Sequence, residues 1–338
     1  MSSVLNLLDI PLLPLAHILK TMSIQDLLNL SYEQEIIQEF LKKIPIRSGG
    51  YKCTLNRHGI IIEMEKQSFT FNWNNDSIPD LLDVFDESFD HFDKVFPGGI
   101  NKLEVCPIIF SEYIDRIPTE CSILSIGEEI ELEDIEEEEE YSEETPESLL
   151  NQTNFNSGLI LNASIRFEVT NAKLFNVDYL KIRNSEWMTS SSLERLQNKI
   201  IHLQNSYLLE TEINSFLHNL KNGNGNKRLE VLTIESEEEE FDFTAVLNGL
   251  ETIVTENQVY SMDKSTIEGA GHFLPFYLWR NIILHETHDF VTQDGRRVSI
   301  QSGGPRAIRV FVWKSKESRK RGSEEVDGPA AKKHCSLN

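Results

Sequence analysis

The chain has 338 residues, 39% of them hydrophobic, and it carries a formal net charge of −23 at pH 7. A chain of this length can form one large or two modest domains, and its apolar content is sufficient for a real core. The excess of carboxylates excludes non-specific nucleic-acid binding, which needs clustered Lys and Arg against phosphate, and it favours protein partners with basic surfaces.

The cysteines and the hydropathy pattern exclude further classes of protein. Cys53, Cys106, Cys121 and Cys335 are scattered without a C-x-x-C pair, so they form neither a zinc ligand set nor a disulfide-dense scaffold. The N-terminus has no basic region ahead of its apolar residues, and no stretch approaches the length of a membrane span. We therefore expect a cytoplasmic or nuclear protein that works without a membrane.

Residues 7–31 carry apolar side chains at helical spacing in a segment too short to fold alone. Ser23 is an N-cap candidate for a second short helix, which would contain Leu27. Two short helices bury too little apolar surface for independent stability, so we expect them to dock on a partner chain or on the body of this one. The apolar positions of the first helix are Leu12, Leu15, Ile18 and Leu19.

Residues 51–126 have the pattern of a small mixed α/β region. A helix is predicted over 78–92, where apolar residues repeat on one face, and the Pro97-Gly98-Gly99 sequence ends it. The strands are predicted from β-branched and aromatic runs bounded by turn residues. They cover residues 51–55, 59–65, 68–73, 102–105 and 123–126.

Residues 128–147 contain a dense run of Glu, whose mutual repulsion opposes an amphipathic helix. We expect a disordered acidic loop over 127–150, which is either a solvated insertion or a docking segment for basic partners. The shorter run at 235–240 has the same interpretation.

The most regular part of the sequence lies between the two acidic runs. Strand-like segments at 179–182, 200–203 and 229–234 alternate with helices predicted at 190–198 and 212–220. This alternation is typical of leucine-rich-repeat-like units, in which right-handed connections make the strands parallel and place the helices outside. The opposite, concave face would then be a protein-binding surface.

The C-terminal part is predicted to end in a hairpin turn at Asp294-Gly295 and a final alternating strand at 309–313. The polar tail after it has two basic clusters about ten residues apart, which resemble a bipartite nuclear-import signal. A merely soluble basic tail is the alternative. The basic residues are Lys316, Arg319, Lys320, Arg321, Lys332 and Lys333.

The sequence offers little for catalysis. His285, Glu286 and His288, with Asp289 and His272 nearby, are the main concentration of metal-ligand types, but they lack the glutamate base and spacing of a metalloprotease. Surface histidines beside a core helix at 279–284 explain them more simply. With no nucleophile elbow or phosphate loop in view, we expect no catalytic, cofactor or metal residues, and a metal-dependent enzyme stays a third alternative.

Two parts of the chain resemble a known family. The segment Ile10-Pro11, with Leu12, Leu13, Leu15, Ile18, Leu19, Met22-Ser23, Leu27 and Leu30-Ser31, resembles an F-box of the large nematode F-box family. The segments Leu180-Lys181-Ile182, Ile201-His202-Leu203, Arg228-Leu229-Glu230-Val231-Leu232 and Phe311-Val312-Trp313 resemble the F-box associated domain, type 2, of that family.

The resemblance and the pattern together predict an α+β or α/β protein in which a short helical F-box precedes a mixed domain with leucine-rich-repeat-like units. The expected divisions are an F-box at 6–45, a mixed region at 51–126, the acidic loop at 127–150, a substrate-binding domain at 155–313 and a basic tail at 314–338.

The resemblance implies a substrate-recognition subunit of a cullin-based, SCF-type ubiquitin ligase, which is not itself an enzyme. The F-box would bind a Skp-type adaptor, and the downstream domain would bind an unidentified target protein. An interaction scaffold that keeps the fold without joining a ligase is the alternative, which the acidic segment at 32–44 permits. The implied adaptor-binding residues are Ile10, Pro11, Leu12, Leu15, Ile18, Leu19 and Leu27.

Overall fold

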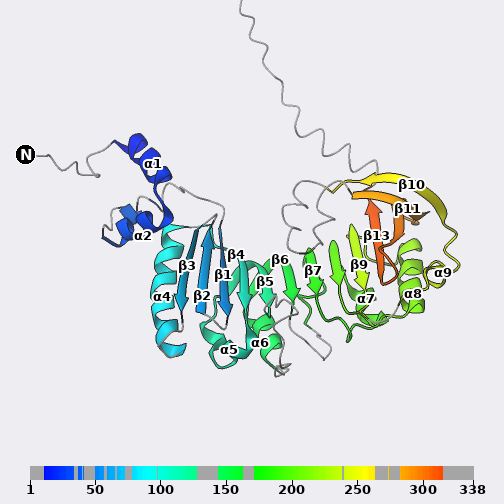
Figure 1. The fold of residues 1–338 in the computed structure, drawn as a ribbon, viewed down its shortest axis with the longest axis horizontal. Helices are drawn as coiled ribbons and strands as arrows, with labels where there is room; N and C mark the ends of the chain where they lie inside the picture. The colour runs from blue at the N-terminus through cyan, green and yellow to red at the C-terminus, as the bar shows by residue number, and fades with distance from the viewer. Residues whose placement is uncertain are drawn as a thin grey trace, which may run out of the picture. The chain divides into compact units, whose positions relative to one another are not determined.

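The structure of the protein is a computed structural model (Figure 1), and its contacts divide the chain into two compact units, Met1–Ser164 and Ile165–Asn338. Both units are mixed α/β, which confirms the predicted mixture of helices and strands. The residues that the structure describes are 11–33, 37–39, 41, 50–56, 59–64, 67–72, 78–96, 98–127, 144–162, 171–237, 240–262, 273 and 282–314.

In unit 1 the strands follow the order β3-β2-β1-β4-β5-β6. β1, β2 and β3 are antiparallel neighbours, whereas β1, β4, β5 and β6 run parallel. The strands are β1 (Tyr51–Asn56), β2 (Gly59–Met64), β3 (Gln67–Asn72), β4 (Ile100–Val105), β5 (Glu120–Ile126) and β6 (Asn154–Leu161). β1 to β5 confirm the strands predicted from sequence, and β6 belongs to unit 1 although the predicted substrate-binding domain begins at residue 155.

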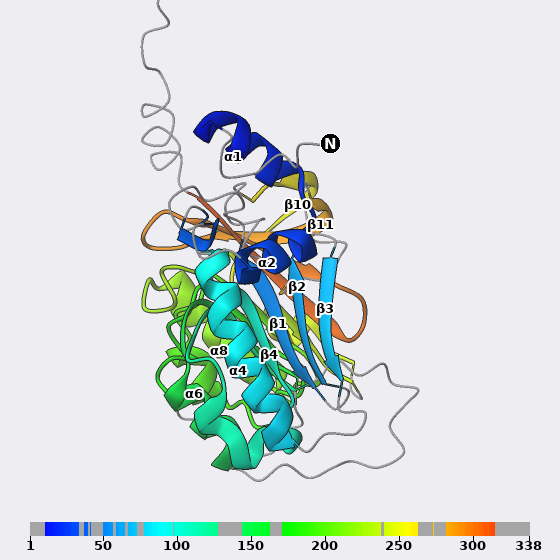
Figure 2. The ribbon, with the colours of Figure 1, turned by 90° about the vertical axis from the view of Figure 1, so that its left-hand side faces the viewer.

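An aromatic cluster joins helix α4 (Ile78–Val95; Figure 2) to β1 and β3. The ring of Tyr51 on β1 lies 4.8 Å from that of Phe92 and 6.1 Å from that of Phe89, and both pairs meet edge to face. Such pairs add about 0.5–1.5 kcal/mol to the burial of their area. The apolar face that predicted this helix therefore also positions it. The other helices of unit 1 are α1 (Leu12–Thr21), α2 (Ile24–Glu33), α5 (Pro107–Phe110), the 3-10 helix η2 (Ser111–Arg116) and α6 (Glu144–Gln152).

Helix α6 corrects the predicted extent of the acidic loop, because its residues 144–150 were expected to lie in that loop. Thr145, Leu149 and Leu150 are buried, and the amide of Gln152 donates to the carbonyl of Ile114 at 2.7 Å. Burial of these two leucines holds the segment to the unit despite its glutamates. Residues 128–143 lie outside the described residues.

In unit 2 the strands follow the order β7-β8-β9-β13-β12-β11-β10. β7, β8 and β9 are parallel, as the strand and helix alternation predicted, and the other neighbours are antiparallel. The elements are β7 (Tyr179–Ile182), α7 (Ser190–Arg195), β8 (Ile200–Leu203), α8 (Glu210–Lys221), β9 (Val231–Glu235), α9 (Phe243–Val246), β10 (Ile253–Tyr260), β11 (Ile282–Val291), β12 (Arg297–Ser302) and β13 (Ala307–Trp313).

Local signals in the sequence explain the boundaries of several of these elements. Thr189 caps α7 by accepting a hydrogen bond from the backbone N–H of Ser192, as expected of the Thr/Ser cluster there. Gly223 follows α8 with φ +73°, a left-handed conformation that favours glycine. Gly295, with φ +81°, forms the predicted turn between β11 and β12.

The predicted helix at 279–284 is wrong where the structure describes it, because β11 begins at Ile282. Ile282 and Leu284 are buried with the exposed Ile283 between them, and this period of two is typical of a strand. Across the described ranges, no helix combines the length and apolar character that a membrane crossing requires.

Candidate functional site

One face of the parallel strands of unit 2 is apolar, and the other, here called the polar face, carries a row of polar side chains next to a row of buried apolar ones. On the apolar face, Leu180, Ile201, Leu232 and Val310 are register partners across β7, β8, β9 and β13, and all four are fully buried. Right-handed connections place α7 and α8 on one side of these strands, and α8 contributes four buried apolar side chains to the core. Those side chains are Ile213, Phe216, Leu217 and Leu220.

The polar face carries a continuous line of polar side chains, here called the polar row. Lys181, His202, Thr233, Arg309 and Gln301 are register partners across β7, β8, β9, β13 and β12. His202 and Thr233 at its centre are buried, and the other three are half-buried. Thr233 Oγ1 has no hydrogen-bond partner among the described residues. Because His202 and Thr233 are buried, Lys181, Gln301 and Arg309 are the members of the row that solvent reaches.

His202, at the centre of the polar row, contacts a carboxylate at the end of β9. His202 Nδ1 lies 3.2 Å from the carbonyl oxygen of Phe273, which can only accept, so Nδ1 carries a proton. His202 Nε2 lies 3.2 Å from Glu235 Oε2, and Gln204 donates to the same oxygen at 3.2 Å. Burial by itself raises the pKa of Glu235, but its contacts with His202 and Gln204 outweigh this and lower it. Glu235 therefore stays ionised at neutral pH as the last residue of β9, which corrects its assignment to an acidic loop.

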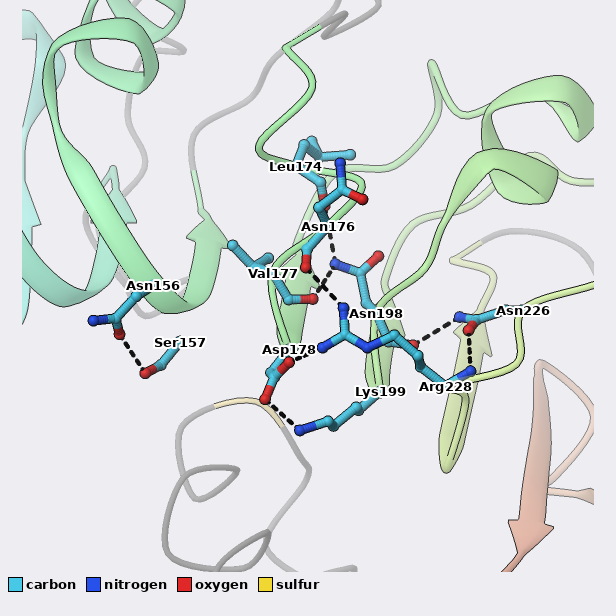
Figure 3. A network of polar contacts seen from close by, with 10 residues as sticks. All are labelled: Asn156, Ser157, Leu174, Asn176, Val177, Asp178, Asn198, Lys199, Asn226 and Arg228. Atoms are coloured by element: carbon cyan, nitrogen blue, oxygen red, sulfur yellow. Dashed lines mark hydrogen bonds and ion pairs between the residues drawn. The ribbon is translucent and has the colours of Figure 1, made fainter.

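A ladder of buried amides connects the loops that precede the three parallel strands (Figure 3). Asn198 Nδ2 donates to the carbonyls of Leu174 and Val177 at 2.9 and 2.8 Å, and Asn226 Nδ2 donates to the carbonyl of Asn198 at 2.7 Å. Each strand and helix unit thereby donates hydrogen bonds to backbone carbonyls of the preceding unit. This arrangement stabilises the unit by pairing buried backbone carbonyls, and Asn198 Oδ1 has no hydrogen-bond partner among the described residues.

Charged side chains reinforce the same loops on their exposed side (Figure 3). Asp178 pairs with Lys199 and with Arg228, and Arg228 Nη1 also donates to the carbonyl of Asn176 at 3.1 Å. These residues precede β7, β8 and β9, so they fix the starting points of the three strands. The alignment of the strands in turn determines which residues are register partners in the polar row.

Asp289 is the centre of a second polar cluster, formed by β10, β11 and β12. Its carboxylate accepts from Thr255 Oγ1 at 2.9 Å, Thr287 Oγ1 at 2.8 Å and Arg297 Nε at 2.8 Å. Burial raises the pKa of Asp289, but hydrogen bonds from Ser299, Arg297 and the two threonines outweigh it and lower the pKa. A buried, fully bonded carboxylate of this kind holds strands together, and it has no lone pair to spare for a reaction.

The predicted metal-ligand candidates His285 and His288 both lie on β11, where a separation of three residues does not place them on one face. His285 is exposed. His288 Nδ1 lies 3.2 Å from Thr252 Oγ1, and its ring meets that of Phe243 edge to face at 5.4 Å. In the described part of the chain, no group of three potential ligands could hold a metal ion.

Three of the predicted adaptor-binding residues, Leu15, Leu19 and Leu27, are buried in the chain itself. Ile18 is 36% exposed, and Pro11 is exposed at the start of α1. Helix α2 contacts α4, and Ile18 is an exposed apolar side chain among the α1 residues whose side chains the structure describes. Ile10, the side chain of Leu12 and the nuclear-import residues Lys316, Arg319, Lys320, Arg321, Lys332 and Lys333 lie outside what the structure describes.

A histidine joins α4 to α2. Ser31 Oγ donates to the carbonyl of Leu28 at 2.8 Å, so it must accept from His91 Nε2, which lies 2.7 Å away. His91 Nδ1 then accepts from Gln38 Nε2 at 3.3 Å, which makes the imidazole neutral. Burial and the nearby Lys94 lower the pKa of His91, in agreement with this tautomer.

A comparison with known protein families gives a match to the region that contains part of the polar row. Residues 171–234 match the F-box associated family. The matched segment contains β7 and β8, most of β9, the amide ladder, and the polar-row residues Lys181, His202 and Thr233. No curated protein and no solved structure matches the chain. The match supports an F-box-associated protein.

Proposed function

We propose that this chain is the substrate-recognition subunit of a cullin-based, SCF-type ubiquitin ligase, with an F-box of the nematode type. The observation that carries the proposal is the match of residues 171–234 to the F-box associated family. Two short amphipathic helices, α1 and α2, precede it in the position that an F-box would occupy. In this order, an adaptor-binding segment would precede a target-binding domain in the same chain.

The proposed adaptor surface includes the exposed Ile18 and Pro11 on α1. Ile18 is a β-branched apolar side chain at the surface of a short helix, which is a typical anchor for a preformed groove. Leu15, Leu19 and Leu27 would contribute by holding the helices in place, since they are buried in the chain.

The proposed target-binding element is unit 2, in which strands and helices alternate as β7-α7-β8-α8-β9, and we propose that this alternation forms leucine-rich-repeat-like units. In this succession the helices occupy one face and leave side chains of the polar row on the other. The chain would make and break no bond. It would act by effective concentration, because a target held beside the conjugating enzyme presents its lysines at a high local concentration. Such a protein would work in the cytoplasm or the nucleus.

The test is co-purification of the full chain with a Skp-type adaptor, beside two variants of α1. Ile18→Asp places a charge at the proposed anchor, and His17→Asp places the same charge at the neighbouring exposed position. Loss of a central apolar anchor costs about 1–4 kcal/mol of binding, so we expect the complex to be lost with Ile18→Asp and kept with His17→Asp.

Circular dichroism and a thermal melt of both variants would show that the helices are intact. If neither the natural chain nor His17→Asp binds the adaptor, the ligase assignment is wrong. The chain would then be an interaction scaffold that retains the fold without joining a ligase.

A further inference from the structure

Strand β10 lies at one end of the unit 2 sheet and pairs with β11 alone among the described strands (Figure 1). The outer edge of such a strand presents backbone N–H and C=O groups that can pair with another chain. Asn257, with φ +51°, interrupts the strand, so the regular part of this edge is short and spans residues 253–256. A short edge suits the addition of one extended segment.

The exposed apolar side chains gather around this edge. The large apolar side chains that are exposed among the described residues number eight, and five of them lie on β10 and β11. Val259 and Ile283 are direct cross-strand partners, and Val291 lies two residues beyond Asp289, the partner of Ile253. Apolar side chains clustered at a sheet edge mark an interaction site more often than chance exposure does. The five are Ile253 (74% exposed), Val254 (54%), Val259 (51%), Ile283 (58%) and Val291 (63%).

The charges at the same edge specify the kind of partner. Glu256 on β10 and Glu286 on β11 are register partners, and both are exposed. Like charges directly opposite each other destabilise a sheet, and a Lys or Arg side chain placed between them would relieve the repulsion. Glu251, just before β10, is exposed as well.

A second copy of this chain is a poor occupant for the edge. Pairing β10 with its counterpart would add two more glutamates to an already repulsive pair, and each chain carries a net charge of −23. An extended segment that alternates basic and apolar side chains would place the basic ones on the face of Glu256 and Glu286 and the apolar ones on the face of Ile253.

We propose that the outer edge of β10 binds an extended segment of the target protein by strand addition, and that this segment alternates Lys or Arg with β-branched apolar residues. Its main chain pairs with residues 253–256, its basic side chains lie on the face of Glu256 and Glu286, and its apolar side chains lie on the opposite face, beside Ile253. The identity of the partner as a ligase target rests on the proposed function, whereas binding of the segment to the edge does not.

The test uses the full chain and a fluorescent eight-residue peptide that alternates Val and Lys. Fluorescence anisotropy gives its affinity, and hydrogen exchange read by mass spectrometry gives the protection of 250–262. A peptide that alternates Val and Glu tests charge. A Val/Lys peptide with N-methyl groups on alternate amides tests strand pairing, because it keeps the charge and loses the donors along one edge.

Two charge-reversed variants complete the design. Glu256→Lys removes the proposed contact, and Glu186→Lys makes the same change of charge at an exposed position in the loop between β7 and α7. We expect the natural chain and Glu186→Lys to bind the Val/Lys peptide equally, and Glu256→Lys to bind it about tenfold more weakly. We also expect protection of 250–262 with the Val/Lys peptide and none with the N-methylated one.

Several outcomes would overturn the inference. Equal binding of the N-methylated peptide would reduce the effect to general attraction between a basic peptide and an acidic protein. Equal binding by Glu256→Lys would place the contact elsewhere. A dimer of the natural chain in light scattering that Glu256→Lys alters would assign the edge to a second copy.

The adaptor experiment separates this inference from the proposed function. A chain that binds the peptide but not the adaptor keeps the edge site and loses the ligase role. A chain that binds the adaptor but gives no protection at β10 keeps the ligase role and loses the edge site.

Discussion

The two ends of the unit 2 sheet differ in how much of their apolar surface is buried. Strands β7, β8 and β9 bury an entire apolar row, and the amide ladder bonds the loops before them. Strands β10 and β11 leave five large apolar side chains exposed and place two glutamates opposite each other. A region that is complete contributes stability, and one that is incomplete in both apolar contacts and charge has the properties of a binding surface.

The largest expected difference in the free energy of unfolding is between the same substitution, Ile to Ala, at the two ends of the unit 2 sheet. Ile234 on β9 is fully buried, whereas Ile253 on β10 is 74% exposed. Ile234→Ala should lower the free energy of unfolding by about 2–5 kcal/mol, because it removes buried methyl groups and leaves a cavity. Ile253→Ala should change it by less than about 0.5 kcal/mol. Urea denaturation of both variants measures the difference, and a similar loss in the two would remove the contrast between the strands.

The amide ladder provides the next test. Asn198→Ala leaves the carbonyls of Leu174 and Val177 without their donor, which should cost about 2–4 kcal/mol of stability. Asn176→Ala removes an exposed amide that donates to the carbonyl of Ala172, and it should cost less than about 1 kcal/mol. Denaturant midpoints of the two variants report the effect. Equal midpoints would mean that the ladder is not what stabilises the parallel strands.

At the β10 edge, a substitution should raise the stability of the folded chain instead of lowering it. Glu256→Lys replaces a like-charge cross-strand pair by an attractive one with Glu286, so it should stabilise the chain by about 0.2–1 kcal/mol. The melting temperature should rise in low salt, and the gain should shrink as salt is added. A lower melting temperature would show that the glutamate pair is not a source of strain in the free protein.

The smallest expected effect is on the pH dependence of stability, and it concerns Asp289 on β11. Asp289 has a pKa below its ordinary value of 3.8, so the folded state gains stability from its ionised form at pH values above that of the unfolded chain. This contribution is lost as the pH falls through the lower, folded pKa. The Asp289→Asn variant should therefore lose less stability than the natural chain between about pH 5 and pH 3, which denaturation at a series of pH values would reveal. An unchanged slope would mean that Asp289 carries no special share of the acid sensitivity.

Local pattern was sufficient to predict the elements that depend on near neighbours in the sequence. The aromatic and apolar face of residues 78–92 predicted α4, and the Thr/Ser cluster at 189 predicted the start of α7. Three strand-like segments separated by helices predicted a parallel arrangement, which the register of β7, β8 and β9 confirms. Helical period, caps and strand alternation are properties of a few consecutive residues, so the sequence displays them directly.

Several features of the candidate sites were not predictable in this way. The sequence Glu256-Asn257-Gln258 gives β10 no apolar alternation, and the strand forms because β11 supplies its hydrogen bonds. Glu235 stood in an acidic run, yet contacts with His202 and Gln204 make it the end of a strand. Helix α6 likewise contradicts its local glutamates because Leu149 and Leu150 are buried.

The sequence by itself determined most of the helices and strands, where the parallel units begin and which family the middle of unit 2 matches, but it did not determine α6, β10 or the start of β11. Only the tertiary structure decided that Lys181, His202 and Thr233 form one row, and that Glu256 faces Glu286 at an open edge. The reason is that register joins residues far apart in the chain. A shift of one residue in any strand would turn these side chains to the other face, and no local pattern records that choice.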